Sequence, residues 1–403
     1  MTVRRSLALL IAASTLLLAV WIVLPAPTYF FLTYSVGAVE VSAWIVVASL
    51  IALALAWPDV RTRGRGTAAF NCAAAALVLG LSPYARFPFA AKRFDREMTR
   101  ALGSDPLRSV DNAARAKLRE HPLSVRDLFA GIPLGSATVT RGVYVAAPGG
   151  VTLTVDIHRP AGAGTYPIVV QIYGGAWQRG APASNDDYAQ WLSSRGYVVF
   201  AIDYRHAPAF HFPAQIEDVR TDLAWIRDHA AEYGGDTSRV AILGRSAGGH
   251  LAMLAAYTPG PLAMKAVVSL YGGIDLVNGY DHPPFPDPLN IPDVELKLIG
   301  GTPSQFPELY REGTIFTYVT HKQPPTLLIY GGRDNLVEAK YGAILRDSLA
   351  AQGTTVAFLE IPWANHAFDE VLNGPSDQLA MYHTGRFLAW ALSPDRSTPP
   401  QRR

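Results

Sequence analysis

Residues 240–250 read VAILGRSAGGH, and this stretch decides the fold predicted for most of the chain. The apolar residues 240–243 predict a buried strand, and a helix is expected to begin near Ala247. Ser246 lies between them in the pattern Gly-x-Ser-x-Gly, which is typical of a serine held on a sharp strand-to-helix turn. Such a turn has no room for bulk beside the serine, so glycine is expected at positions 244 and 248. A plain turn is the alternative, but the flanking strand and helix favour a nucleophilic hydroxyl raised above a sheet.

Short apolar runs separated by helical segments continue on both sides of this stretch. Residues 151–157 alternate and predict a half-buried strand. Continuously apolar runs predict buried strands at 168–170, 197–202, 240–243, 266–270 and 326–330. The first of these strands is expected to extend to residue 172 and the fourth to residue 271, and a further strand is expected at 355–361. Helical segments such as 215–233 and 247–257 separate most of them, as in a mostly parallel sheet with helices on both faces. We therefore expect an α/β domain over residues 138–392.

A serine hydroxyl needs a base to take its proton and a third group to orient that base. On this kind of scaffold the acid and the histidine follow the serine in that order, each after a late strand. Asp334 follows the run 326–330, and His366 follows the run 355–361. We therefore predict Ser246, Asp334 and His366 as catalytic residues. Asp275, after the run that ends at residue 271, is the alternative acid.

The reaction also needs hydrogen-bond donors for the oxyanion that forms when the serine attacks. Residues 173–177 read YGGAW and follow a predicted strand. Glycines there let backbone N–H groups approach the substrate, so Gly174 and Gly175, together with Ala247, are the candidate oxyanion hole. The alternative is a simple Gly-Gly hairpin turn.

The other histidines and the composition exclude several classes of site. His250 is interpreted as fixing the nucleophile turn and His383 as a surface or packing residue, while His206 and His211 are structural or line the pocket. The sequence contains no His-Glu-x-x-His pattern, so no metal and no cofactor is expected. Its single cysteine, Cys72, excludes an internal disulfide and a cysteine-based metal cage. With 35 Lys+Arg against 33 Asp+Glu and no basic stripe, a nucleic-acid partner is not expected.

The N-terminal region carries an excess of apolar residues. The 403-residue chain is 49% hydrophobic and 17% charged, and its mean hydropathy of +0.13 is high for a soluble enzyme. Residues 6–24 and 36–57 each match the roughly 20 residues that cross a bilayer, and the shorter run 67–81 is either a third span or a buried helix. Residues 1–85 are therefore predicted to be a helical transmembrane region. A cleaved signal peptide at 6–24 is the alternative, which its long apolar run and poor cleavage site disfavour.

The side of the membrane that carries the α/β domain stays open. Arg4 and Arg5, like the arginines of residues 61–65, favour the cytoplasmic side. Three spans would place the domain outside the cytoplasm and two spans inside. The basic residues after the third run favour the inner side: Arg86, Lys92, Arg93, Arg96 and Arg100.

Residues 86–137 are predicted to be a helical, amphipathic connector. Apolar residues at helical spacing within 87–103 indicate a helix that lies on lipid headgroups or packs on its own domain. Asp105-Pro106 predicts the start of a second helix that ends before Pro122. Residues 393–403 are expected to be a polar tail.

The motifs together carry a resemblance to a known family. They are Tyr173-Gly174-Gly175-Ala176-Trp177, Asp203-Tyr204-Arg205, Gly234-Gly235-Asp236, Gly244 to His250, Gly332-Arg333-Asp334 and His366-Ala367-Phe368. Over about residues 140–392 the chain resembles the α/β-hydrolase superfamily, within it the hormone-sensitive-lipase-like and feruloyl-esterase-like carboxylesterases. The resemblance implies the α/β-hydrolase fold, Ser246 as nucleophile, His366 as base, Asp334 as acid and the oxyanion donors given above. It also implies that the segment at Asp203 supports the oxyanion loop.

Two positions depart from the family pattern. The family usually has histidine where this chain has Tyr173, and often a glycine where it has Ala176. Both positions are expected to act mainly through the backbone, so activity is expected to survive. The methyl group of Ala176 is expected to crowd bulky acyl or alcohol groups.

These features predict a membrane-anchored serine hydrolase of the carboxylesterase or lipase type that acts on a small-molecule or lipid ester. Residues 281–292 are expected to cover the pocket, with Trp177, Phe285 and Leu289 as substrate contacts. Amide hydrolysis of arylformamidase or peptidase type, or acyl transfer, would use the same triad. A non-catalytic membrane-bound scaffold is the remote alternative. The oligomeric state and the natural ester cannot be read from the sequence.

Overall fold

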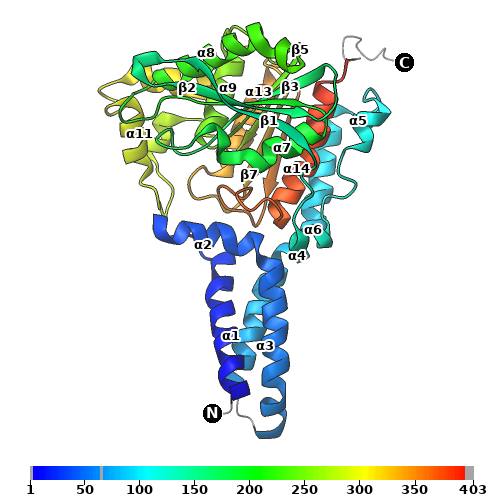
Figure 1. Ribbon diagram of the computed structural model, residues 1–403. Helices are drawn as coiled ribbons and strands as arrows, with labels where there is room; N and C mark the ends of the chain where they lie inside the picture. Colours follow the sequence, from blue (N-terminus) through cyan, green and yellow to red (C-terminus); the bar gives the residue numbers. More distant parts are fainter. Residues whose placement is uncertain (1–2, 64–66, 395–403) are drawn as a thin grey trace.

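The computed structural model describes residues 3–63 and 67–394. A narrow helical stem carries a larger α/β domain, and helix α2 lies crosswise between the two parts (Figure 1). Residues 395–403 of the expected polar tail lie outside the described residues.

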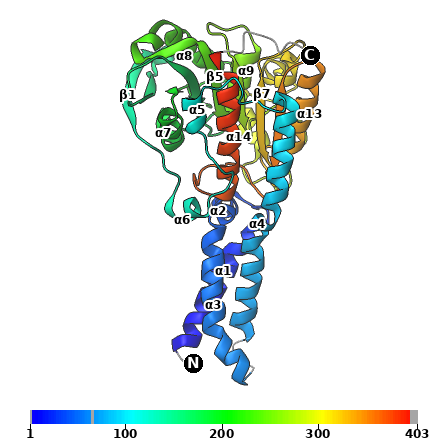
Figure 2. The same cartoon turned by 90° about the vertical axis from the view of Figure 1, so that its right-hand side faces the viewer.

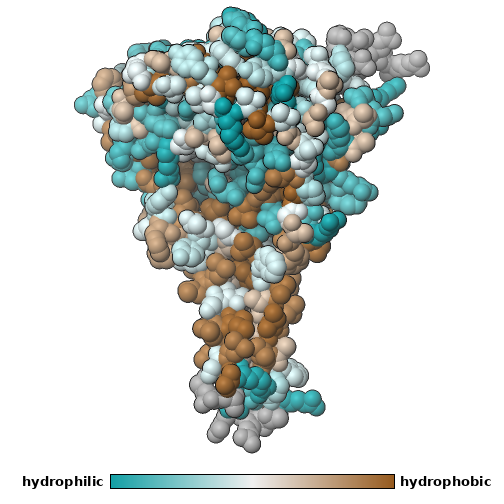
Figure 3. Space-filling model, in the orientation of Figure 1, coloured by the Kyte–Doolittle hydropathy of each residue, from teal (hydrophilic) through white to brown (hydrophobic). Residues whose placement is uncertain are grey.

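The stem consists of α1 (Val3–Ala19), α3 (Ser42–Arg63) and the first half of α4 (Thr67–Leu102). Small side chains let these helices approach closely, and the buried ones are Ala8, Ala12, Ala52, Ala56, Ala69 and Ala73. Among the described residues, three helices are long and apolar enough to cross a membrane, by length and composition: Val3–Ile22, Ser42–Arg61 and Thr67–Leu102. The surface of the stem is largely hydrophobic (Figure 3).

The sequence predicts one helix over residues 36–57, but in the structure this run is divided between two helices. Helix α2 (Tyr29–Glu40) ends before Val41, and α3 starts in a new direction at Ser42. The reason is a tertiary contact of Glu40, whose carboxylate accepts a hydrogen bond of 3.0 Å from the backbone N–H of Ser376. This contact holds the end of α2 against the α/β domain.

Helix α4 continues without a break through the expected boundary between residues 85 and 86. Its second half packs on the α/β domain, with Phe87, Ala90, Phe94 and Met98 buried, and Phe87 stacks on Trp363 at 5.7 Å. Residues 87–103 therefore cover their own domain.

The prediction of a helix that starts at Asp105-Pro106 is wrong. A short helix, α5 (Asn112–Ala116), begins later, because Asp111 caps it by accepting a hydrogen bond of 2.8 Å from the N–H of Ala114. Helix α6 (Val125–Ala130) then leads into the α/β domain.

The described residues of the α/β domain contain an eight-stranded sheet with strand order β1-β2-β4-β3-β5-β6-β7-β8. Its strands are β1 (Ala137–Ala146), β2 (Leu153–Pro160), β3 (Tyr166–Ile172), β4 (Val198–Ile202), β5 (Gly235–Arg245), β6 (Ala266–Leu270), β7 (Thr326–Gly331) and β8 (Val356–Ile361). β1 and β2 pair antiparallel, β2 also pairs antiparallel with β4, and the remaining pairs are parallel. The mostly parallel sheet is thus confirmed.

Helices lie on both faces of the sheet; α13 and α14, for example, lie on opposite sides of β7 (Figure 2). The helices of the domain are α7 (Asp186–Ser194), α8 (Ala214–His229), α9 (Ala247–Tyr257), α10 (Leu276–Asp281), α11 (Ile291–Ile299), α12 (Pro307–Gly313), α13 (Ala339–Ala351) and α14 (Pro375–Ala391). Because β5 to β8 are parallel neighbours, the loops that follow β5, β7 and β8 meet at one edge of the sheet. That edge is the one that faces α2.

Candidate active site

Ser246 occupies a strained turn between β5 and α9. Its φ of 51° and ψ of −120° lie where side chains other than glycine are rare. A Cβ on Gly244 would lie 2.1 Å from the carbonyl oxygen of Gly248, and one on Gly248 would lie 2.3 Å from two carbonyl oxygens at the end of β3. Both glycines are therefore required sterically. The backbone N–H of Ser246 donates to the carbonyl of Leu270 at 2.9 Å, which fixes the turn to β6.

The structure brings the hydroxyl, imidazole and carboxylate of the predicted triad into one hydrogen-bonded series. His366 Nε2 lies 2.9 Å from Ser246 Oγ, and His366 Nδ1 lies 2.8 Å from Asp334 Oδ2. The other carboxylate oxygen of Asp334 accepts hydrogen bonds from the N–H groups of Leu336 at 2.8 Å and Val337 at 2.9 Å. A proton on Nδ1 therefore faces the carboxylate, which leaves Nε2 free to accept the serine proton.

Asp275 has a different position. Its carboxylate caps α10 by accepting a hydrogen bond of 3.0 Å from the N–H of Asn278. It lines a cavity beside the serine, but the carboxylate bonded to His366 is that of Asp334.

The loop after β3 lies directly against the nucleophile turn. A Cβ on Gly174 would lie 2.9 Å from the carbonyl oxygen of Arg245 and 3.2 Å from Ser246 Cβ, and one on Gly175 would lie 2.0 Å from the carbonyl oxygen of Arg179. Ala176, with a φ of 54°, has the left-handed conformation that favours glycine, which costs about 1–2 kcal/mol for an L-residue. This explains sterically why glycine would also suit this position.

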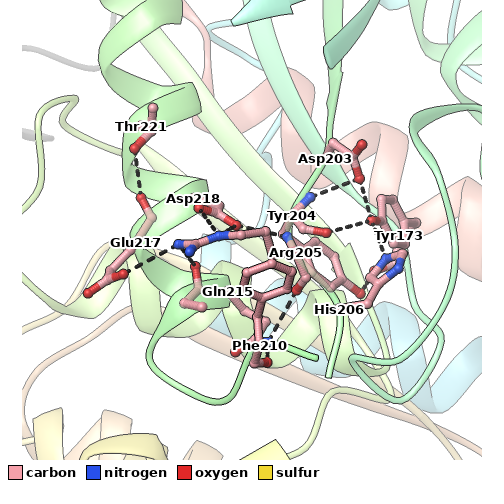
Figure 4. A network of polar contacts seen from close by, with 11 residues as sticks. Tyr173, Asp203, Tyr204, Arg205, His206, Phe210, Gln215, Glu217, Asp218 and Thr221 are labelled. Carbon is pink, nitrogen blue, oxygen red and sulfur yellow. Dashed lines mark hydrogen bonds and ion pairs between the residues drawn. The ribbon is translucent and has the colours of Figure 1, made fainter. Parts of the chain in front are cut away.

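The side chain of Tyr173 ties the start of this loop to the segment after β4 (Figure 4). Its hydroxyl donates to Asp203 Oδ1 at 2.6 Å and lies 2.9 Å from His206 Nε2. Its ring stacks on Tyr204 at 4.5 Å, and burial raises the pKa of Asp203. Position 173 thus acts through its side chain as well as its backbone, contrary to the expectation from the sequence. Figure 4 also shows the same segment fixed to α8 by the 2.8 Å ion pair between Arg205 and Asp218.

A buried ion pair that the sequence reasoning missed joins the nucleophile turn to the histidine loop. Arg245 Nε lies 2.5 Å from Asp369 Oδ2, and the hydroxyl of Tyr271 donates to the other carboxylate oxygen of Asp369. Burial disfavours the charged guanidinium, but the Asp369 carboxylate outweighs it, so the pKa of Arg245 lies above its ordinary value. The Tyr271 ring in turn lies 4.6 Å from the imidazole of His366. An arginine beside the serine and an aspartate shortly after His366 were the available signals.

Two cavities meet at Ser246 and His366. The first, of about 760 Å³ with its open mouth, is lined by Trp177, Leu289 and other mostly apolar residues. The second, of about 1680 Å³ with its open mouth, extends along the loop of Gly174 and Gly175 and also reaches Leu289. Both cavities lead away from the same reactive atoms, as an ester with two substituents requires.

Of the expected substrate contacts, Trp177 and Leu289 line these cavities, but Phe285 lines neither. The side chain of Phe285 is 99% exposed. Its neighbour Pro284 faces the first cavity, and the carbonyl of Pro286 accepts a hydrogen bond from Asn335 at 3.0 Å. Since both neighbours are held by the protein, the intervening ring projects outward.

The other histidines have structural positions. His250 is buried, lies 2.6 Å from the carbonyl oxygen of Gly313, and packs edge-on against Trp177 at 5.2 Å; burial lowers its pKa to about 4. His383 is buried in α14 rather than at the surface, and burial lowers its pKa to about 3. His211 Nδ1 lies 2.9 Å from the carbonyl of Lys297. Within residues 3–63 and 67–394, no group of three or more His, Cys, Asp or Glu side chains could hold a metal ion.

A mostly parallel eight-stranded sheet with a serine turn after β5 defines an α/β-hydrolase fold. Solved structures with this fold include the bacterial heroin esterase, with a TM-score of 0.56 and 21% identity over 70% of this chain and 98% of that one. Butyrate-bound esterase Est2 of Thermogutta terrifontis has a TM-score of 0.50 and 23% identity over 64% and 92% of the two chains. At these identities the likeness concerns the fold alone.

Residues 155–349, just under half of the chain, match the model of the family described as BD-FAE. Among curated proteins of Mycobacterium tuberculosis, the probable carboxylic ester hydrolase LipM is 32% identical over 219 residues, 51% of this chain and 50% of LipM. The esterase LipQ is 31% identical over 280 residues, 63% of this chain and 65% of LipQ. The chain thus spans about half to two thirds of the length of these relatives.

Proposed function

We propose that this protein is a membrane-anchored carboxylesterase that cleaves carboxylic esters through an acyl-enzyme on Ser246. The observation that carries the proposal is the continuous hydrogen-bonded series from Ser246 through His366 to Asp334 beside a glycine loop. The names of the relatives LipM and LipQ support esters as the substrate class.

Each group has a distinct task in this mechanism. Ser246 Oγ attacks the ester carbonyl while His366 Nε2 takes the hydroxyl proton, and Asp334 stabilises the imidazolium that forms. The N–H groups of Gly174, Gly175 and Ala247 bind the oxyanion. The alcohol leaves with the proton from His366, and a water molecule, activated by the same imidazole, then releases the acid and restores the serine.

The smaller cavity selects for apolar substituents. Leu276, Leu289 and Ile291 line it beside Trp177, so burial of an aliphatic or aromatic group contributes binding energy there. Among the acids that line it, Glu295 is the most buried, and burial and neighbouring carboxylates raise its pKa to about 9, so this side chain adds no charge to the wall at neutral pH.

The arginines at the far end of the stem favour an extracytoplasmic α/β domain. The N-terminus lies at the end of the stem farthest from that domain (Figure 1), and Arg4 and Arg5 both pair there with Asp59 near the end of α3, at 2.9 and 2.7 Å. Arg61 adds a further positive charge at this end. Because basic residues favour the cytoplasmic side, three spans would carry the domain to the opposite side. We expect protease added to intact cells to cleave the α/β domain. Protection of the domain from the protease would instead indicate that it lies on the cytoplasmic side.

The activity is tested with the full-length protein in detergent. We expect a fluorophosphonate probe to label the wild type, p-nitrophenyl acetate to be hydrolysed, and Ser246→Ala to abolish both. Hydrolysis that persists in Ser246→Ala would refute the mechanism. Comparison with the matching p-nitroanilide, and with added alcohol as acceptor, would reveal amide hydrolysis or acyl transfer.

A further inference from the structure

Helix α2 and the segment that precedes it are docked directly on the loops that carry the proposed base and acid. Asn365, next to His366, donates to the carbonyl of Ser35 at 2.6 Å. Asn335, next to Asp334, donates to the carbonyl of Ala26 at 3.4 Å. Arg333, on the other side of Asp334, donates to the carbonyl of Val23. The segment that joins the stem to the site is therefore held by both catalytic loops.

One face of α2 forms a wall of the larger cavity. The lining residues recur at helical spacing, and they are Tyr29, Leu32, Thr33, Val36 and Gly37. The opposite wall contains Gly174, Gly175, Ser246 and His366. A groove with an apolar helix on one side thus leads straight to the reacting hydroxyl.

The mouth of this groove lies at the level where the stem meets the α/β domain. Apolar side chains are exposed around it, with Phe30 at 68%, Tyr29 at 50% and Leu24 at 49%. Phe285 belongs to the same belt, because Asn335 bonds the carbonyls of both Pro286 and Ala26. Aromatic side chains gather at the membrane–water interface, and the brown surface of the stem continues up to this level (Figure 3).

We propose that the groove along α2 admits the apolar chain of an ester that resides in the bilayer, so that the substrate class is a long-chain lipid ester taken up from the membrane surface. The chain lies against α2, the carbonyl lies at Ser246, and the smaller cavity holds the other substituent. This inference rests on the proposed esterase activity. The occupant is identified by three features: the groove joins the catalytic serine, its wall on the α2 side is mainly apolar, and its mouth opens beside the proposed membrane stem.

The test enlarges a residue that lines the groove. A Cβ on Gly37 meets nothing within 4 Å, so Gly37→Phe fills open space rather than clashing with the protein. Tyr34 is exposed and does not line the groove, so Tyr34→Trp is the matched control. The full-length protein, reconstituted in phosphatidylcholine vesicles, is assayed with soluble p-nitrophenyl acetate and with p-nitrophenyl palmitate held in the bilayer.

We expect Gly37→Phe to lower the ratio of palmitate to acetate turnover at least about tenfold, and Tyr34→Trp to change it by less than about twofold. Fluorophosphonate labelling reports whether the variant site is folded, and Leu32→Trp, on the same face, should repeat the result if Gly37→Phe does not fold. An equal loss on both esters, or an unchanged ratio, would overturn the proposal. A wild type that cleaves acetate but not palmitate would overturn it and leave the esterase activity standing. A wild type that cleaves neither would refute the proposed function itself.

Discussion

The buried ion pair behind the triad gives a prediction whose magnitude follows from its burial. Asp369→Asn keeps the shape of the side chain but removes the charge that faces Arg245, and both side chains are at most 2% exposed. The guanidinium would then be a buried charge without its carboxylate. Removing one partner of a buried pair costs about 3–5 kcal/mol, far more than the net contribution of the pair itself.

This loss is large enough to measure as a thermal shift. For a domain of about 250 residues, 1 kcal/mol corresponds to roughly 2–4 °C in Tm, so Asp369→Asn is expected to lower Tm by about 6–20 °C. The assay is thermal unfolding of the full-length protein in detergent, followed by circular dichroism. Esterase activity should fall as well, because Asp369 belongs to the loop that carries His366.

The control is an exposed ion pair in the same domain. Glu308 and Arg311 lie 2.7 Å apart, but their side chains are 73% and 56% exposed. Exposed pairs contribute about 0–1 kcal/mol, so Glu308→Gln should leave Tm almost unchanged. A shift below about 2 °C for Asp369→Asn, or equal shifts for the two variants, would refute the reasoning from burial.

Three further outcomes test the site. Asp334→Asn is expected to lower kcat about 10³–10⁴-fold and Asp275→Asn less than about tenfold in an ester hydrolysis assay, and the opposite ranking would reassign the acid. Gly248→Ala should abolish turnover, since its methyl group would lie 2.3 Å from two carbonyl oxygens; a folded variant with a tenth of the activity would contradict this. Glu295 has its pKa raised from 4.5 to about 9, so the folded state keeps a proton that the unfolded chain loses. The contribution of Glu295 to the free energy of unfolding is then fully present below about pH 4.5 and falls towards pH 9 by at most about 1.4 kcal/mol per pH unit. Glu295→Gln should flatten that fall in denaturant unfolding, and an unchanged slope would contradict the assignment.

The sheet and the serine turn could be predicted because their signals are local. A strand of apolar residues followed by glycine, serine and glycine restricts the backbone wherever it occurs, and the predicted helix from Ala247 to Tyr257 agrees with α9. The predicted strands at 266–271 and 355–361 likewise agree with β6 and β8 within one residue. The structure places Ser246, His366 and Asp334 within hydrogen-bonding distance of one another in series. Their catalytic roles stay a prediction that the variants test.

The rest of the site depends on contacts between distant parts of the chain. Glu40 ends α2 through Ser376, which lies 336 residues further on, and no periodicity within residues 36–57 carries that information. Phe285 is apolar and was expected in the pocket, but its direction is decided by the two prolines that flank it. In the sequence, only its position shortly after His366 marks Asp369, and its contact with Arg245 arises only in the fold.

The same long-range contacts make the helical stem part of the proposed enzyme rather than a detachable anchor. Asn365 and Asn335 flank the base and the acid; Asn365 donates to the carbonyl of Ser35 in α2, and Asn335 donates to the carbonyl of Ala26 in the segment between α1 and α2. Arg333 is half-buried against the same segment, and this burial lowers its pKa. Removal of residues 1–40 would replace these acceptors by water beside the catalytic loops, and each lost hydrogen bond would cost about 0.5–1.5 kcal/mol. It would also remove one wall of the larger cavity. Residues 138–392 alone, although they contain Ser246, Asp334 and His366, would therefore be a different and less ordered catalyst.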